Sequence, residues 1–309
     1  MAYSRARFSD EFVPGLFGLA IDTYRMKRAE SMWSQMCTKK TSKKESEENL
    51  DRSGVGMPEL KADGAKVAYD VQIPGTKQEW IHDVWALAIR IHEEAIEDNL
   101  YELGAGGSGD KLKEPVHDLS EAMAENEEVK MARFLVNGAA TTYHTTRSSK
   151  ALFATDHPRL DGSTFSNKST ATDMTYTAFW SAVVAAENQL GHTGYRVSKK
   201  VKNVWVPPQM ERQAIEILKS SDRPDTGNRA TNAMVKSGRK IGIKVWPHLT
   251  DADAWYLQLD GTGIIHFTRR KQRFARERDF QTGDMMIKAD QRWSAEVDDP
   301  RDWYGVIPA

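Results

Sequence analysis

The chain contains 309 residues with a mass of 34.9 kDa, of which 39% are hydrophobic, enough for one large folded domain or two moderate ones. Its 43 Lys and Arg residues and 44 Asp and Glu residues give a formal net charge of -1, which excludes a global basic field and makes any nucleic-acid contact local. A single cysteine, Cys37, excludes an intrachain disulfide framework and a cysteine zinc site, and the apolar runs are too short to cross a bilayer, so we expect no membrane contact.

The N-terminal region is predicted to be one amphipathic helix over 16–37, because its apolar residues recur mostly at three- and four-residue steps. From Thr38 to Asp83 the composition becomes charged and then rich in glycine and proline, so this stretch can bury little. Its strand-like pieces, 66–73 and 79–88, alternate apolar and polar residues. These two pieces predict an extended two-stranded hairpin that projects from the body.

A glycine run over 104–109 precedes a second predicted helix, 112–136, whose apolar residues form one stripe along its length. Gly138 is suited to ending this helix, since glycine is common just past helix C-termini. The following segment, 139–173, contains turn residues such as the Asp161-Gly162 pair, and we expect little regular structure there.

Helical and strand patterns alternate from Tyr176 onward, which indicates a compact α/β unit. The predicted elements are a helix over 176–190, a strand over 201–206, a helix over 209–219, and strands near 241–246, 255–259 and 264–267. Residues 269–297 then alternate charged and apolar side chains and predict one or two long strands.

Incomplete motifs argue against catalysis and against nucleotide or metal binding. The glycine run is followed by Asp110, where a phosphate-binding loop needs lysine, so it is interpreted as a linker. His92 begins a zinc-protease pattern, but Ile96 stands where the second histidine is required. We therefore expect no enzyme activity, no cofactor and no metal ligands.

Two further motifs that contain aspartate are interpreted as turns. Pro158 holds His157 extended, which favours a turn at Asp156-His157-Pro158 over an Asp-His catalytic dyad. Asp251 and Asp253 lack the additional carboxylates of a calcium loop, so we expect them to shape the turn before Trp255.

The densest basic feature is the run 269–273, extended by Arg276 and Arg278. Interleaved phenylalanines would suit base stacking, so a nucleic-acid-binding strand is one interpretation. Glu277 and Asp279 dilute the charge, and a strand sends alternate residues to opposite faces. We favour a half-buried strand with a charged outer face at a subunit contact.

Several segments, in this order, resemble the major capsid proteins of tailed phages that share the Hong Kong ninety-seven type fold, which encapsulin shells also use. The segments are 38–42 with the acidic run 45–51, 64–70, Ala151-Leu152-Phe153-Ala154-Thr155-Asp156-His157-Pro158 with 162–167, 204–208 before 215–218, and 246–249 before 253–259. The similarity extends over nearly the whole chain.

This resemblance implies an α+β fold with an N-terminal arm, an extended β-hairpin loop, a peripheral domain with a long spine helix, and an α/β axial domain. The implied boundaries are 1–37 for the arm, 38–88 for the extended loop, 89–150 for the peripheral domain with its spine helix at about 112–136, 151–267 for the axial domain, 268–298 for a long strand returning to the peripheral domain, and 299–309 for the C-terminal segment.

The resemblance also implies a major capsid protein that self-assembles into hexamers and pentamers of an icosahedral shell around phage double-stranded DNA. Expected partners are copies of itself, a separate scaffolding protein, a portal protein, and DNA on the inner face. The expected location is the virion capsid, after assembly in the host cytoplasm. The alternatives are an encapsulin-like compartment shell and a nucleic-acid-binding protein that uses 269–278.

Charged residues of the extended loop and of the basic run are the expected contacts between subunits, because complementary charges set the register of an interface. These residues are Lys39, Lys40, Lys43, Lys44, Glu47, Glu48, Arg269, Arg270 and Arg273.

Overall fold

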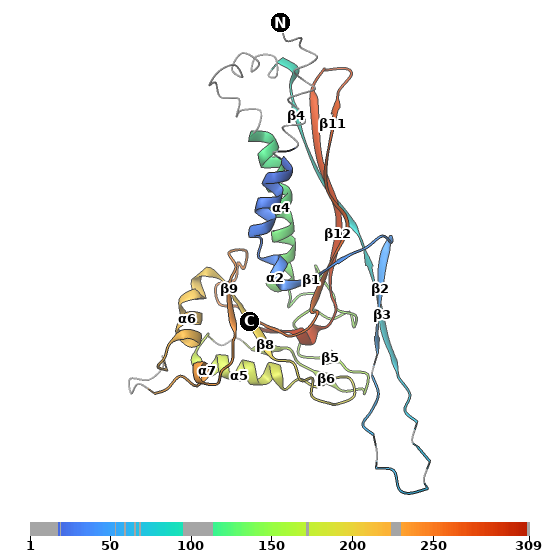
Figure 1. The fold of residues 1–309 in the computed structure, drawn as a ribbon, viewed down its shortest axis with the longest axis vertical. Helices are drawn as coiled ribbons and strands as arrows, with labels where there is room; N and C mark the ends of the chain where they lie inside the picture. The colour runs from blue at the N-terminus through green and yellow to red at the C-terminus, as the bar shows by residue number, and fades with distance from the viewer. Residues whose placement is uncertain are drawn as a thin grey trace.

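The computed structural model describes residues 18, 20–52, 54–58, 60–64, 66–67, 69–94, 114–170, 173–223 and 230–307. It shows an upright column of long strands beside a long helix, with a hairpin extending from the lower part of the column and a compact α/β unit beside its base (Figure 1). The glycine run over 104–109 lies outside the described residues.

The N-terminal helix ends earlier than predicted. Residues 20–30 are helical, a short helix α2 spans Trp33–Met36, and strand β1 begins at once as Cys37–Thr41. The prediction of one helix through residue 37 is therefore wrong at its end. The backbone N–H of Met32 donates to Glu128 Oε1 at 2.6 Å, so it is taken by a side chain from another helix instead of by the preceding turn.

The hairpin is formed by strands other than those predicted. Strand β2, Ser46–Arg52, pairs antiparallel with β3, Pro74–Ile81, whereas the described residues from 54 to 73 contain no strand. Trp80, which is 2% exposed, anchors β3 against Ile265 and Phe267. The predicted strand over 66–73 has no such neighbour, since Val67 and Tyr69 are 64% and 96% exposed.

Four strands form the sheet of the column, in the order β1-β11-β12-β4. Strand β4 spans Asp83–Ile91, β11 spans Ile264–Arg278 and β12 spans Met285–Val297, so the segment 269–297 holds two long strands joined by a tight turn. Strand β1 is parallel to β11 at one edge, and β4 is antiparallel to β12 at the other.

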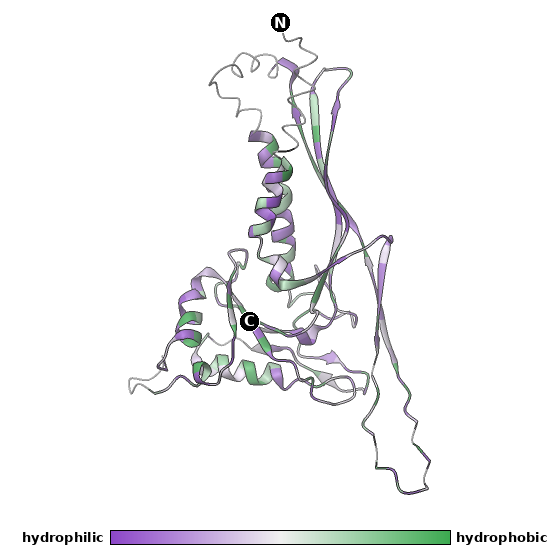
Figure 2. Cartoon of the chain, in the orientation of Figure 1, coloured by the Kyte–Doolittle hydropathy of each residue, from purple (hydrophilic) through white to green (hydrophobic). Residues whose placement is uncertain are grey.

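Helix α4, Glu114–Val136, packs on one face of this sheet, and the predicted helix is confirmed where the chain is described. Its upper half buries Val116, Leu119 and Met123 against Ile287 and Ala289 of β12. Apolar and polar residues alternate along α4 in Figure 2, as expected for a helix with one buried face.

The α/β unit is built on a five-stranded sheet in the order β7-β13-β10-β8-β9. Its strands are β7, Lys168–Thr170; β13, Trp303–Ile307; β10, Trp255–Leu259; β8, Val201–Val206; and β9, Gly242–Val245. Its helices are α5, Tyr176–Glu187; η2, Pro208–Met210; α6, Glu211–Lys219; and α7, Ala233–Lys236. The predictions for β8 and β10 are confirmed residue for residue, while β7 and β13 were not predicted.

One hydrophobic core connects the column to the α/β unit. Its buried residues include Phe134 of α4, Trp205 of β8, Tyr256 of β10 and Trp293 of β12. The short hairpin of β5, His157–Pro158, and β6, Thr164–Phe165, lies at the edge of the α/β unit. Within the described residues, no helix combines the length and apolar character needed to cross a bilayer.

Candidate functional site

An open groove of about 900 Å³ lies where the hairpin leaves the sheet. It is lined by Arg28 of the N-terminal helix and by residues of β1, β2, β3 and β11, namely Lys39, Lys40, Thr41, Glu47, Glu48, Asn49, Trp80, Ile265, Phe267, Thr268 and Lys271. The structure therefore brings together four of the predicted contact residues, Lys39, Lys40, Glu47 and Glu48. Both signs of charge surround an apolar floor made by Trp80, Ile265 and Phe267.

Two of the three groove lysines lie over aromatic rings. Lys39 Nζ lies 5.0 Å from the centroid of Trp33, and Lys40 Nζ lies 5.9 Å from that of Phe267. Such contacts hold the aliphatic stems in place while the ammonium groups stay exposed. The parallel pairing of Lys40 with Phe267 sets this placement.

Ion pairs run along the hairpin strands. Glu48 pairs with Lys77 at 2.6 Å, and Lys44 approaches Glu47 at 3.6 Å. A hydrogen bond from the Ser42 hydroxyl is the main reason that the pKa of Glu47 lies below its usual range. Arg269 Nε donates to the carbonyl of Lys44 at 2.9 Å and so joins β11 to the start of the hairpin.

Arg270 and Arg273 of β11 do not line the groove, although Lys271 between them does. Both pair with Asp290, at 3.0 Å and 2.7 Å, and Lys288 lies 3.9 Å from the same carboxylate. Hydrogen bonding from Arg273 is the first cause of the lowered pKa of Asp290. The predicted contact residues therefore fall into two groups, one at the hairpin base and one on the column.

A polar cluster that the sequence did not reveal fixes the hairpin to the body. Asp51 of β2 meets Arg147 at 3.3 Å and His192 at 2.8 Å, and Asp298 accepts hydrogen bonds from both Asn49 and Arg147. Asp51, Arg147, His192 and Asp298 border a cavity of about 530 Å³. Because the partners come from segments far apart in the sequence, no local pattern could have identified the cluster.

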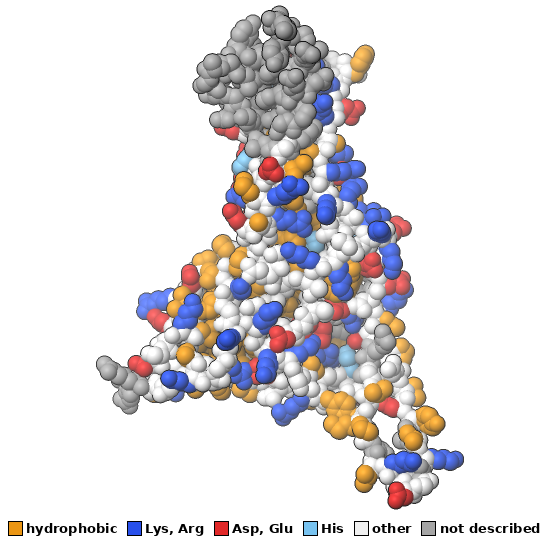
Figure 3. All heavy atoms as spheres, in the orientation of Figure 1, with side chains coloured by type: hydrophobic (Ala, Val, Ile, Leu, Met, Phe, Trp, Pro, Cys, Tyr) orange, Lys and Arg blue, Asp and Glu red, His pale blue; other side chains and the backbone are white. Residues whose placement is uncertain are grey.

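The hairpin tip exposes apolar side chains. Leu60, Tyr69, Val71 and Met57 are 101%, 96%, 77% and 71% exposed. Figure 3 shows hydrophobic side chains gathered along the outstretched hairpin. An exposed apolar group of this kind marks a surface that another molecule covers.

The residues considered for catalysis serve structural roles. His157 is 1% exposed, with Nε2 3.2 Å from the carbonyl of Leu152 and 3.1 Å from Asn167 Oδ1. Asp156 pairs with Lys150. The N–H of Asp253 donates to Asp251 Oδ1 at 3.1 Å, which confirms the predicted turn before Trp255.

The zinc-protease pattern at His92 does not produce a ligand pair. His92 lies 3.3 Å from Asp284, and Ile96 is outside the described residues.

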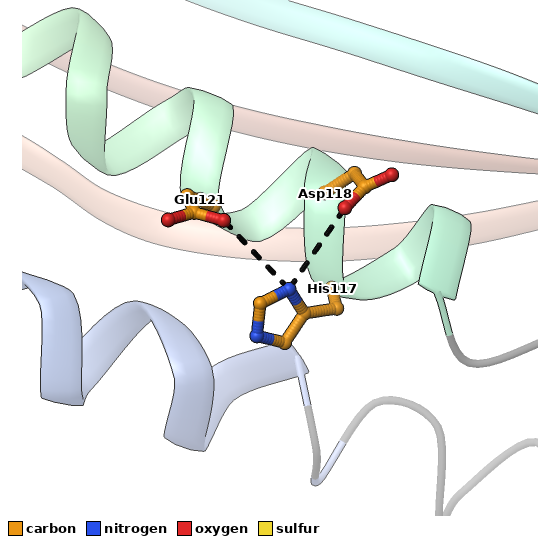
Figure 4. A group of neighbouring side chains, drawn as sticks. All are labelled: His117, Asp118 and Glu121. Atoms are coloured by element: carbon orange, nitrogen blue, oxygen red, sulfur yellow. Dashed lines mark ion pairs between the residues drawn. The ribbon is translucent and has the colours of Figure 1, made fainter. Parts of the chain in front are cut away.

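One group on α4 has metal-compatible side chains, namely His117, Asp118 and Glu121 (Figure 4). His117 and Asp118 are adjacent on this helix, and Glu121 lies one turn after His117. The side chains of His117 and Asp118 are 45% and 79% exposed. Lys27 Nζ lies 2.6 Å from Glu121 and already neutralises that carboxylate. We assign no metal to it.

A family model described as phage capsid protein matches residues 82–307. The chain belongs to the phage capsid protein family. The match begins just before β4 and covers β4, β11 and β12 of the column, the spine helix α4 and the α/β unit, but not β1. No curated protein matches the sequence.

Solved capsid structures share the fold of this capsid protein. The capsid of cyanophage P-SCSP1u is 11% identical, covers 90% of this chain and 88% of that chain, and superposes with a TM-score of 0.54. Microbacterium phage Oxtober96 gives 11% identity, 90% and 91% coverage and a TM-score of 0.55. A virus-like particle from Pyrococcus furiosus gives 10% identity, 95% and 98% coverage and 0.52.

These findings confirm the predicted α+β capsid fold and the predicted function. The protein is a major capsid subunit, a structural component of the virion shell that assembles with copies of itself. The encapsulin-like compartment and the separate nucleic-acid-binding protein are not favoured.

Proposed function

We propose that this subunit closes hexamers and pentamers of an icosahedral shell by laying its hairpin across a neighbouring copy. The exposed apolar tip carries this proposal. Leu60 and Tyr69 are almost fully exposed in the single subunit, so we propose that an interface with another subunit buries them. Many such weak contacts, repeated around a closed shell, add up through multivalency.

The charged hairpin base is proposed to set the register of that interface. Lys43 and Lys44 are exposed at the turn between β1 and β2, and the carboxylate of Glu48 is 57% exposed despite its partner Lys77. Lys39, Lys40 and Glu47 line the groove, and Arg269, Arg270 and Arg273 of β11 belong to the same proposed set of contacts. Rim charges of this kind contribute specificity more than affinity.

The remaining roles follow from the same assignment. The proposed divisions of the chain are the arm at 1–37, the extended loop at 38–88, the peripheral domain at 89–150, the axial domain at 151–267, the returning strands at 268–298 and the C-terminal segment at 299–309. We propose that the subunit works without catalysis, assembles in the host cytoplasm with separate scaffolding and portal proteins, and encloses double-stranded DNA.

A hairpin-tip variant tests the assembly proposal. Because Lys39 and Lys40 belong to β1 within the sheet, the change must spare the hairpin base and is restricted to 53–73. Arg52 and Pro74 are paired, so an Asn-Gly turn can join them. We expect a folded subunit with an unchanged melting temperature that forms no closed particles by negative-stain microscopy.

A second variant separates apolar contact from hairpin length. Leu60→Ser, Tyr69→Ser and Val71→Ser together should abolish closure, while the matched control Lys61→Ser, Asp63→Ser and Lys66→Ser should retain it. Closed particles of normal size from both the shortened and the apolar-to-serine variants would refute the proposal.

A further inference from the structure

Residues 66–72 of the hairpin, which we call the tip segment, alternate apolar and polar side chains as a strand does. Their described part nevertheless contains no strand in the single subunit. Val67, Tyr69 and Val71 would share one face of such a strand, and all three are exposed. Asp70 would lie on the opposite face. The tip segment therefore has the side-chain pattern of a strand without a described sheet to join.

Strand β4 offers an open sheet edge. It is the last strand of the column sheet and, among the described strands, pairs only with β12. In an antiparallel pair every other residue directs its N–H and C=O groups away from the partner, so β4 presents a row of these groups along its edge. Residues 84–89 of β4 carry no charge, and Val84 and Leu87 are 57% and 49% exposed.

The other described edge strands are protected against pairing with a further chain. Strand β1 spans five residues and carries Lys39 and Lys40, while β7 and β9 span only three and four residues. The hairpin strands β2 and β3 contain several charged residues. Short length and charge are the usual devices that keep a sheet edge from pairing. Strand β4, with nine residues, has neither device over 84–89.

The two faces of β4 differ in polarity, as the two sides of the tip segment do. On the face toward α4, Leu87 lies between Trp85 and Ile89, so this face suits the apolar side of the tip segment. On the opposite face, Ala88 is paired in register with Lys288 of β12. The small alanine lets the Lys288 side chain, which is 52% exposed, reach past the edge strand. One face of this edge is therefore apolar and the other is basic.

Charge complementarity decides which side of the tip segment meets which face of β4. Asp70 accepts hydrogen bonds from the N–H groups of Gly56 and Val71, and its described contacts include no cation. The side chains of Arg90 and Lys288 are 51% and 52% exposed on the basic face. A tip segment with its apolar side toward α4 brings Asp70 to these cations, whereas the reverse placement would put the carboxylate on the apolar face.

We propose that the tip segment of one copy adds to the free edge of β4 in a neighbouring copy, as a fifth strand of the column sheet. The inference rests on the proposed laying of the hairpin across a neighbour, and it adds the surface that receives the tip and the backbone pairing that holds it. Backbone hydrogen bonds supply affinity, and the alternating side chains select the face. The same contact buries the apolar tip and closes an open sheet edge.

Cysteine pairs test this strand addition in particles assembled from the full-length chain. The background variant Cys37→Ala removes the native thiol. Gln72→Cys is combined in turn with Val84→Cys, Ala86→Cys and Ala88→Cys, because all four residues share the basic face in the proposed arrangement. Opposed residues on one face lie about 5 Å apart, so we expect linked subunits under mild oxidation. A ladder of linked subunits on a non-reducing denaturing gel measures this.

Val71→Cys is the matched control. It lies one residue away and on the apolar side, so with the same three partners it should leave the subunits unlinked. Equal linking by Val71→Cys and Gln72→Cys would overturn the inference, since the tip would then touch β4 without pairing as a strand. Closed particles without a link from any Gln72→Cys combination also overturn it and leave the assembly proposal intact. If neither the Cys37→Ala background nor the wild type forms closed particles, the assembly proposal fails and the inference fails with it.

Hydrogen exchange gives a readout that side-chain burial alone would not move. Amides of β4 and of the tip segment should both exchange ~10-fold or more slowly in closed wild-type particles than in the dispersed subunit. Protection of the tip segment without protection of β4 would overturn the inference.

A charge on the free edge tests the same contact from the side of β4. Leu87→Lys should abolish closed particles and leave the melting temperature of the dispersed subunit unchanged, because Leu87 is half exposed there. The control Ile215→Lys on α6, at a residue that is 38% exposed, should keep both. Normal closure by Leu87→Lys would count against strand addition at this edge.

Discussion

Two buried histidines in this capsid protein have opposite surroundings. His266 is fully buried, with its ring 4.5 Å from Trp33 and 5.0 Å from Trp293. Among the described residues, neither of its ring nitrogens has a hydrogen-bond partner. Burial is the main reason that its pKa is lowered to about 3, so the ring stays neutral. His157 is equally buried but bonds through Nε2 to Leu152 and Asn167.

Replacing each of these histidines by phenylalanine should change stability in opposite directions. His266→Phe removes unsatisfied polar atoms and should raise the free energy of unfolding by about 1 kcal/mol. His157→Phe removes the Nε2 hydrogen bonds to the carbonyl of Leu152 and to Asn167 Oδ1, and should lower it by about 1 kcal/mol. Denaturant titration of both variants at pH 7 measures this. Equal destabilisation by the two changes would contradict the argument.

The same histidine gives a pH dependence with a defined sign. The folded-state pKa of His266, about 3, lies below the unfolded value of 6.5, so the unfolded chain binds more protons between these values. Above pH 6.5, His266 is neutral in both states and its titration does not change the free energy of unfolding. As the pH falls from 6.5 towards 3, protonation of His266 in the unfolded chain lowers the free energy of unfolding. The advantage of His266→Phe should therefore grow between pH 7 and pH 5.

Three carboxylates of the spine helix hold the N-terminal segment in place. Glu127 accepts from the Tyr24 hydroxyl at 3.1 Å and lies 3.5 Å from Arg28, while Glu128 accepts from the N–H of Met32 and from Trp246 Nε1. Desolvation raises the pKa of both. Glu121 forms the exposed third contact, with Lys27.

Burial decides which of these contacts matters. Glu127→Ala leaves Arg28 and Tyr24 facing a cavity and should lower stability by about 3 kcal/mol. Glu121→Ala removes an exposed pair and should cost less than about 1 kcal/mol. Hydrogen exchange of residues 20–30 should accelerate in the first variant and stay unchanged in the second. Similar exchange in both would show that the carboxylates do not hold the segment.

Elements were predictable from the sequence where the chain decides its own structure locally. The apolar runs of β8 and β10 predict where these strands begin and end, and the apolar stripe of α4 predicts where this helix ends. The end of the N-terminal helix involves a contact with Glu128, which is distant in sequence. Apolar periodicity alone therefore predicts a helix that is too long. The charged strand β2 pairs with β3 without an apolar pattern, and so the hairpin was placed on the wrong residues.

At the scale of the whole molecule, the column and the α/β unit share a core. Phe153 stacks on Tyr256 at 5.3 Å, and Trp205 contacts both Trp246 and Trp303. Neither part can lose this packing without exposing the other. The polar cluster around Asp51 was unpredictable for the same reason, because its members meet only once the chain is folded.

A shared core predicts a single unfolding transition for the dispersed subunit. Tryptophan fluorescence, which reports on this core, and far-ultraviolet circular dichroism, which follows the helices, should give the same midpoint. The chain with the Asn-Gly turn in place of 53–73 serves as control and should melt at the same temperature. Two separated transitions would mean that the parts fold independently.

The strand order β1-β11-β12-β4 has a mechanical consequence. The chain enters the hairpin from the edge strand β1 and returns from it into the opposite edge strand β4, so the hairpin connects the two edges of the sheet. A force applied to the hairpin tip is therefore shared between β1 and β4, so neither edge strand is detached from the sheet alone. In the proposed assembly, a neighbour bound to the tip would therefore transmit force to β1 and β4 together.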